Sequence, residues 1–135
     1  MRPELSDKNP YWIERHRYYE LKHFCLQYPF WKRARALADG PDSFPLAMIP
    51  PCKTGEHSDP TAKKAAIRAY YSDRIEMLET IAKETDPIYG GFVLYGVTKG
   101  ISYDIMSVHI QVTISRDLYY DLYRRFFWLL DKARQ

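Results

Sequence analysis

Residues that can hydrogen-bond to nucleic-acid bases recur near the start of the segment 115–133. If this segment is an amphipathic helix, its core-facing side carries the apolar residues Tyr119, Leu122, Phe126 and Leu129. Its outer face would then carry Arg116, Asp117, Tyr120, Asp121 and Arg124. An arginine can donate two hydrogen bonds to guanine, and an aspartate can accept one from the cytosine amino group. These five residues are candidate base readers. The alternative is an ordinary amphipathic helix whose aspartates suit its positive N-terminus.

A second set of residues has the chemistry to meet DNA phosphates rather than bases. Lysine, arginine and hydroxyl side chains commonly make such contacts, which position a protein without reading sequence. The candidates in the C-terminal half are Lys99, Ser102, Tyr103, Ser115, Arg125 and Lys132.

Aromatic and basic residues are interleaved near the N-terminus, over 11–19 and again over 31–35. Aromatic rings can stack on bases while basic side chains follow the phosphates. The candidate contacts in this region are Arg15, Arg17, Lys32, Arg33 and Arg35. The alternative is a helix that packs its aromatic residues against the rest of the protein.

The elements that must position these residues are predicted to be helices. Apolar periodicity indicates helices over 11–28 and 30–38, a long helix of about 25 residues from Asp59-Pro60, and helices over 87–99, 102–108 and 115–133. Residues 108–114 alternate apolar and polar side chains, which leaves turn and strand both open. We therefore expect a mostly α fold: an N-terminal helical arm (1–38), a Pro-rich linker (39–58), and a long central helix with a C-terminal helix-turn-helix (59–135).

The long helix carries one apolar stripe, formed by Ile67, Tyr71, Ile75, Leu78 and Ala82. The stripe spans about 24 Å at 1.5 Å per residue, which is more than a small helix-turn-helix can cover while packing its own helices. A homodimer is the expected partner for this stripe, because many helix-turn-helix proteins bind DNA as dimers. The N-terminal arm is the alternative cover.

Composition narrows the function classes. The 135 residues carry a net charge of +3 and are 16% aromatic, which argues against a wholly disordered chain. The basic surplus lies at the two ends, with eight Lys/Arg against five Asp/Glu over 1–40 and six against four over 90–135. The isolated Cys25 and Cys52 and the scattered histidines predict no metal site, and no motif predicts an enzyme or a cofactor. No apolar run is long enough for a membrane span or a signal peptide, so we expect a cytoplasmic protein without a membrane partner.

Several short segments between residues 58 and 134 carry a family resemblance. They are Ser58-Asp59-Pro60-Thr61, Arg74-Ile75, Gly96-Val97-Thr98, Gly100-Ile101-Ser102-Tyr103, Ile114-Ser115-Arg116-Asp117-Leu118-Tyr119-Tyr120 and Tyr123-Arg124-Arg125-Phe126-Phe127. This part of the chain resembles the RinA/ArpU-type late-gene transcriptional regulators of phages and prophages of Gram-positive bacteria. Its end also resembles the C-terminal helix-turn-helix of bacterial sigma factors, with Ser115-Arg116-Asp117 at the start of the recognition helix.

The resemblance implies a regulator that binds double-stranded DNA near a promoter in the bacterial host cell. The long helix or the arm would hold a partner, which is a second copy or the host RNA polymerase. Two alternatives stay open: a DNA-packaging subunit of the small-terminase type, and a protein-interaction module.

Overall fold

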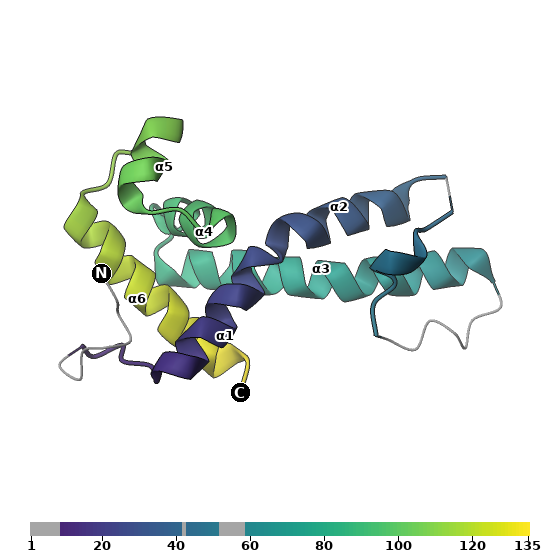
Figure 1. The fold of residues 1–135 in the computed structure, drawn as a ribbon, viewed down its shortest axis with the longest axis horizontal. Coiled ribbons are helices and arrows are strands. Elements are labelled where there is room, and N and C mark those ends of the chain that lie inside the picture. The colour runs from purple at the N-terminus through teal and green to yellow at the C-terminus, as the bar shows by residue number, and fades with distance from the viewer. Residues whose placement is uncertain (1–8, 42, 52–58) are drawn as a thin grey trace. The chain divides into compact units, whose positions relative to one another are not determined.

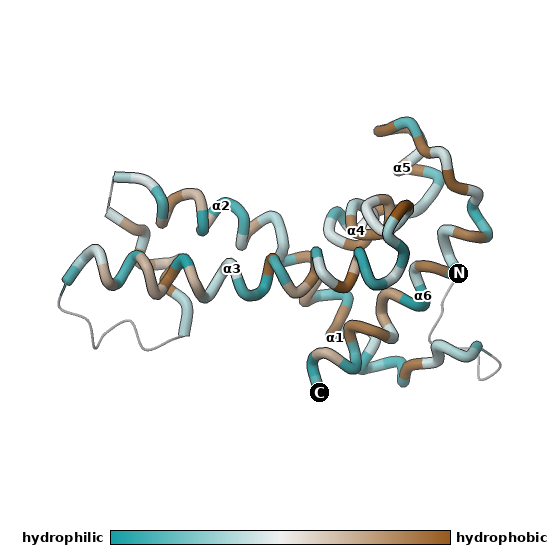
Figure 2. Tube along the Cα trace, turned by 180° about the vertical axis from the view of Figure 1, so that it is seen from behind, coloured by the Kyte–Doolittle hydropathy of each residue, from teal (hydrophilic) through white to brown (hydrophobic). Residues whose placement is uncertain are grey.

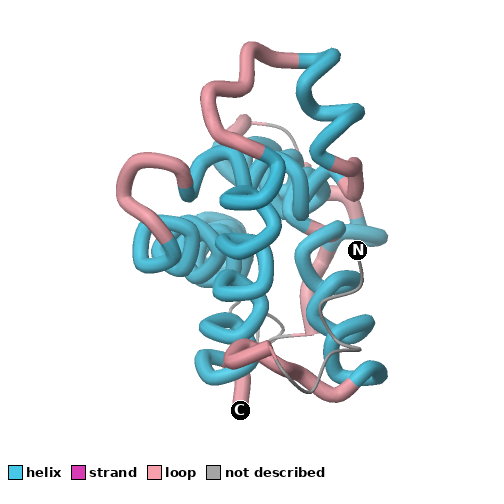
Figure 3. Tube along the Cα trace, turned by 90° about the vertical axis from the view of Figure 1, so that its left-hand side faces the viewer, coloured by secondary structure: helices cyan, strands magenta, loops and turns pink. Residues whose placement is uncertain are grey.

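The computed structural model describes residues 9–41, 43–51 and 59–135, and all regular structure in these ranges is helical (Figures 1 and 3). The α-helices are α1 (Arg15–Leu26), α2 (Tyr28–Asp39), α3 (Pro60–Thr85), α4 (Gly90–Lys99), α5 (Tyr103–His109) and α6 (Arg116–Ala133), with a short 3-10 helix η2 (Leu46–Met48). The mostly α prediction is confirmed for this part of the chain. Cys52, Ser58 and much of the predicted linker lie outside the described residues.

The helices of the described ranges are too short or too polar to cross a membrane. Even α3, the longest of them, mixes hydrophilic and hydrophobic residues along its whole length, as Figure 2 shows.

Serine caps set the starts of α5 and α6. The Ser102 hydroxyl accepts the backbone N–H of Ile105 at 3.3 Å, and the Ser115 hydroxyl accepts that of Leu118 at 3.2 Å. Helix α4 ends at Gly100, whose φ of 67° lies in the left-handed region that glycine adopts most easily.

The start of α4 differs from the sequence prediction. The Asp86 carboxylate accepts the backbone N–H groups of Ile88 and Tyr89 at 2.8 and 2.7 Å, so residues 87–89 form a turn and the helix begins at Gly90. The open question over residues 108–114 is also answered, because α5 continues to His109 and a loop follows it, with no strand.

The helices pack in two units, each with its own buried residues. The first unit comprises the described residues up to Gln27 together with those from Leu78 onward, and the second comprises residues 28–77. In the first unit α1 packs on α4 and α6, and α4 packs on α6 (Figure 1). Its core contains Leu21, Cys25, Val93, Tyr119, Phe126, Phe127 and Leu130.

The predicted arm over residues 1–38 is therefore not one packing unit. Helix α1 carries an apolar face, Tyr18, Leu21, Phe24 and Cys25, that is buried in the first unit. Helix α2 belongs to the second unit, where it runs beside α3 (Figure 1).

Helix α3 buries its stripe within the single chain. Ile67, Tyr71, Ile75, Leu78 and Ala82 are each at most 4% exposed. In the second unit the ring of Phe30 lies 6.0 Å from that of Tyr71, whose hydroxyl donates to the backbone oxygen of Met48. The stripe is thus covered within the chain, and a homodimer stays a prediction.

Candidate functional site

Helix α6 is buried on one side and polar on the other. Tyr119, Leu122, Phe126, Phe127 and Leu130 are buried, whereas Leu129 is only half-buried. The helix is thus turned slightly from the predicted orientation. Its first turns still expose Arg116, Asp117 and Asp121, while Tyr120 and Arg124 are partly buried.

Three of the candidate base readers, Arg116, Asp121 and Arg124, make ion pairs within the unit. One guanidinium nitrogen of Arg116 lies 2.9 and 3.1 Å from the two carboxylate oxygens of Asp104 on α5. Arg124 pairs with Asp121 at 3.2 Å. The side chains of Arg116 and Asp104 are 58% and 68% exposed, and ion pairs exposed to this extent contribute little to stability. Arg116 can therefore exchange Asp104 for another acceptor at small cost.

The candidate phosphate contacts fall into two groups. Lys99 and Lys132 are exposed cations, each near an aromatic ring: 5.0 Å from the centre of Tyr95 and 4.2 Å from that of Trp128. Arg125 donates to the backbone oxygen of Glu84 at 3.4 Å, so it also supports the packing of α6 on the end of α3.

Ser102, Tyr103 and Ser115 hold the local structure. The serines cap α5 and α6, and the Tyr103 hydroxyl donates to the backbone oxygen of Ile114 at 2.6 Å. The backbone N–H of Tyr103 donates to the Tyr120 hydroxyl at 3.3 Å. These bonds fix α5 against the start of α6.

The candidate arm residues are divided between the units. In the first unit, Arg17 donates to the Asp131 carboxylate at 2.7 Å and to the backbone oxygen of Arg134 at 3.1 Å, which joins α1 to the end of α6. Arg15 is exposed, with its guanidinium 6.0 Å from the Tyr19 ring. Lys32, Arg33 and Arg35 lie on α2 in the second unit.

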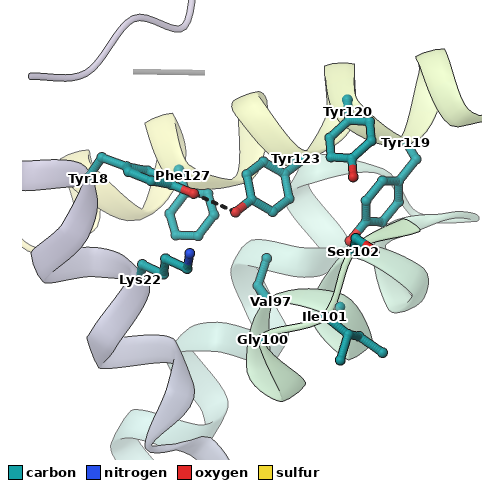
Figure 4. A pocket seen from close by; sticks show the side chains of 11 residues that line it. Tyr18, Lys22, Val97, Gly100, Ile101, Ser102, Tyr119, Tyr120, Tyr123 and Phe127 are labelled. Carbon is teal, nitrogen blue, oxygen red and sulfur yellow. Dashed lines mark hydrogen bonds between the residues drawn. The ribbon is translucent and has the colours of Figure 1, made fainter. Parts of the chain in front are cut away.

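A cavity of about 230 Å³ lies between α1, α4 and α6 (Figure 4). We call it the tyrosine cavity, because its lining includes four tyrosines. Among the described residues the lining is Tyr18, Lys22, Gly96, Val97, Gly100, Ile101, Ser102, Tyr119, Tyr120, Tyr123 and Phe127. Sequence reasoning missed this site. The high tyrosine count was the visible signal, but the rings come from helices about 100 residues apart and meet only in the folded chain.

The tyrosine hydroxyls of the cavity differ in their partners. Those of Tyr18 and Tyr123 are 2.7 Å apart and share a hydrogen bond (Figure 4). The Tyr119 hydroxyl is buried with no hydrogen-bond partner in the described structure, and it lies close over Gly96. Burial raises the pKa of both Tyr119 and Tyr123 above the ordinary tyrosine value.

Removing these two hydroxyls should have opposite effects. Tyr119→Phe should leave the free energy of unfolding unchanged or raise it by about 1 kcal/mol, because a buried unsatisfied group is removed. Tyr123→Phe should lower it by about 0.5–1.5 kcal/mol, because its hydrogen bond to Tyr18 is lost. Urea denaturation of both variants measures the difference. Equal losses would show that Tyr119 has a hydrogen-bond partner after all.

Neither a metal site nor a reactive thiol is visible in the described part of the chain. No group of three or more His, Cys, Asp or Glu side chains there is placed to hold a metal ion. Cys25 is fully buried, and burial raises the pKa of its thiol.

Comparisons with known proteins add no family to this description. No family model matches the sequence, and no curated protein or solved structure matches it either.

Proposed function

We propose that the chain binds duplex DNA through the first turns of α6, with α4, α5 and α6 acting as a helix-turn-helix. The observation that carries the proposal is the polar face of α6: Arg116, Asp117 and Asp121 are exposed directly after the Ser115 cap, while the opposite face is buried in the core. A recognition helix needs this combination, because its N-terminal residues contact base edges while its other side holds it on the domain.

The connection between α5 and α6 supports a fixed recognition helix. It runs from 110 to 115, which is longer than the three or four residues of a tight helix-turn-helix turn. The hydrogen bonds from Tyr103 to Ile114 and Tyr120 compensate by tying the loop and the two helices together.

The Arg116–Asp104 pair suggests how a base is read. In the free protein Asp104 holds the guanidinium at the start of α6. On DNA, guanine would replace the carboxylate as the acceptor, while the exposed Lys99 and Lys132 would meet phosphates. Regulation of phage or prophage late genes, with host RNA polymerase as a further partner, is part of this proposal and rests on the sequence resemblance.

Selection of bound duplexes from random DNA, followed by sequencing, tests the proposal. Arg116→Ala should then weaken binding to the selected site by about 1–3 kcal/mol, the contribution of a good bidentate base contact. Asp104→Ala should bind at least as well as the wild type, because it frees Arg116.

Arg68→Ala is the matched control. Arg68 is also an exposed arginine paired with an aspartate, Asp39, at 2.9 Å, but it lies on α3 in the second unit. The affinity of the Arg68→Ala variant for the selected DNA should stay within about twofold of the wild type, as for a surface substitution outside an interface. No enriched sequence, or Arg116→Ala and Arg68→Ala binding alike, would reject α6 as the reading helix.

A protein-interaction function is the second candidate, favoured by exposed apolar side chains next to this face. Ile105 and Val108 on α5 and Leu118 on α6 are 49%, 83% and 41% exposed. A second copy or another protein would cover them more readily than DNA would. A homodimer would use this surface rather than the buried stripe of α3. A ring of eight or more copies in light scattering would favour the packaging alternative.

A further inference from the structure

We propose that the tyrosine cavity binds a small aromatic carboxylate. The inference does not depend on DNA binding, because it rests on the charge, shape and hydrogen-bonding groups of the cavity alone.

The charge of the cavity selects an anion. Lys22 is the one lining residue that is charged at neutral pH, and the described lining contains no aspartate or glutamate. Figure 4 shows the Lys22 amine turned into the cavity from α1. No ion pair within the described structure uses this amine. A partly buried lysine whose amine has no carboxylate partner favours a ligand that brings one.

The walls of the cavity select a flat ring. The rings of Tyr123 and Phe127 pack edge to face at 4.9 Å between centroids, and Val97 on α4 and Ile101 after it also line the cavity. Aromatic rings pack well between such apolar surfaces. The volume of about 230 Å³ equals that of about eight water molecules in the liquid, which suits one ring with a carboxylate.

The far end of the cavity offers hydroxyl groups. Figure 4 places Ser102, Tyr119 and Tyr120 together, at the end away from Lys22. The Tyr120 hydroxyl accepts the backbone N–H of Tyr103, which leaves its own proton available to a ligand oxygen. The favoured ligand therefore has an oxygen substituent on the ring opposite its carboxylate, as 4-hydroxybenzoate does.

Calorimetric titration of the full chain with 4-hydroxybenzoate, benzoate, cyclohexanecarboxylate and inorganic phosphate tests the site. We expect binding in the order 4-hydroxybenzoate, benzoate, cyclohexanecarboxylate, with inorganic phosphate weakest. No heat from 4-hydroxybenzoate at millimolar concentration would overturn the proposal. Equal binding of inorganic phosphate would also overturn it, since the site would then hold a simple anion without recognising a ring.

Two variants locate the ligand within the cavity. Lys22→Met should weaken binding of both aromatic acids by at least about tenfold, the effect of losing a hydrogen bond to a charged group. Tyr120→Phe should weaken the binding of 4-hydroxybenzoate by a few-fold and leave the binding of benzoate unchanged, because only 4-hydroxybenzoate carries the oxygen substituent on the ring.

Lys32→Met is the control, since Lys32 is an exposed lysine on α2 outside the lining. It should bind both acids as the wild type does. Thermal unfolding of each variant checks that the fold is kept. Lys22→Arg, which retains the charge, should keep most of the wild-type affinity for both acids. Equal affinity in Lys22→Met and Lys32→Met would overturn the assignment.

Discussion

Phe126→Ala should lower the free energy of unfolding by about 3–5 kcal/mol, the cost of deleting a fully buried aromatic ring. Phe126 is 0% exposed, and its ring lies edge to face on that of Phe127 at 5.4 Å. A loss of this size is a large fraction of the stability of an ordinary small domain, so much of the variant would be unfolded at room temperature.

Urea denaturation measures this loss, with Leu118→Ala as the control. Leu118 lies on the same helix but is 41% exposed, so its truncation should cost far less. Equal losses in the two variants would mean that α6 is turned differently in the core, and that the exposure of Arg116 and Asp121 is also wrong.

Gly90→Ala should be strongly destabilising, whereas the same change at the adjacent Gly91 should be stabilising. A Cβ atom on Gly90 would lie 1.9 Å from the backbone oxygen of Ala82, so α3 and α4 would have to move apart. Overpacking of this kind costs about 1–3 kcal/mol or more. A Cβ atom on Gly91 would meet nothing within 4 Å, and alanine in a helix is favoured over glycine by about 1 kcal/mol.

The two variants differ by one position in the same helix, so helix propensity contributes nearly equally to both. The difference between their thermal midpoints therefore measures the close approach of α4 to the end of α3. Midpoints that rise together would show that the two helices are farther apart at this point.

Apolar periodicity and helix-start residues predicted most of the helices, because a helix depends mainly on residues that are close together in the sequence. The predicted starts at 102 and 115 coincide with the caps Ser102 and Ser115, and the spacing from Tyr119 to Phe126 identified the buried side of α6. The start of α4 differs from the predicted residue 87 because the Asp86 carboxylate accepts the backbone N–H groups of Ile88 and Tyr89, which holds residues 87–89 in a turn.

Contacts between distant residues were not predictable in the same way. The sequence named Arg116 as a base reader but gave no reason to pair it with Asp104, which lies on another helix. The interleaved aromatic and basic residues of α1 suggested a separate arm, yet Tyr18 and Arg17 bind α6 through Tyr123 and Asp131. Periodicity shows that a helix has an apolar face, but not which helix covers it.

The burial of Cys25 allows its thiol to report local opening of the first unit. Thiolates react with alkylating reagents and thiols do not, and Cys25 is both fully buried and held in the thiol form by the raised pKa. Reagent can reach it only when α1 separates from its neighbours. In a variant with Cys52 replaced by serine, the rate at which Cys25 is alkylated would measure how often α1 opens. It would show whether α1 opens locally before the first unit unfolds as a whole.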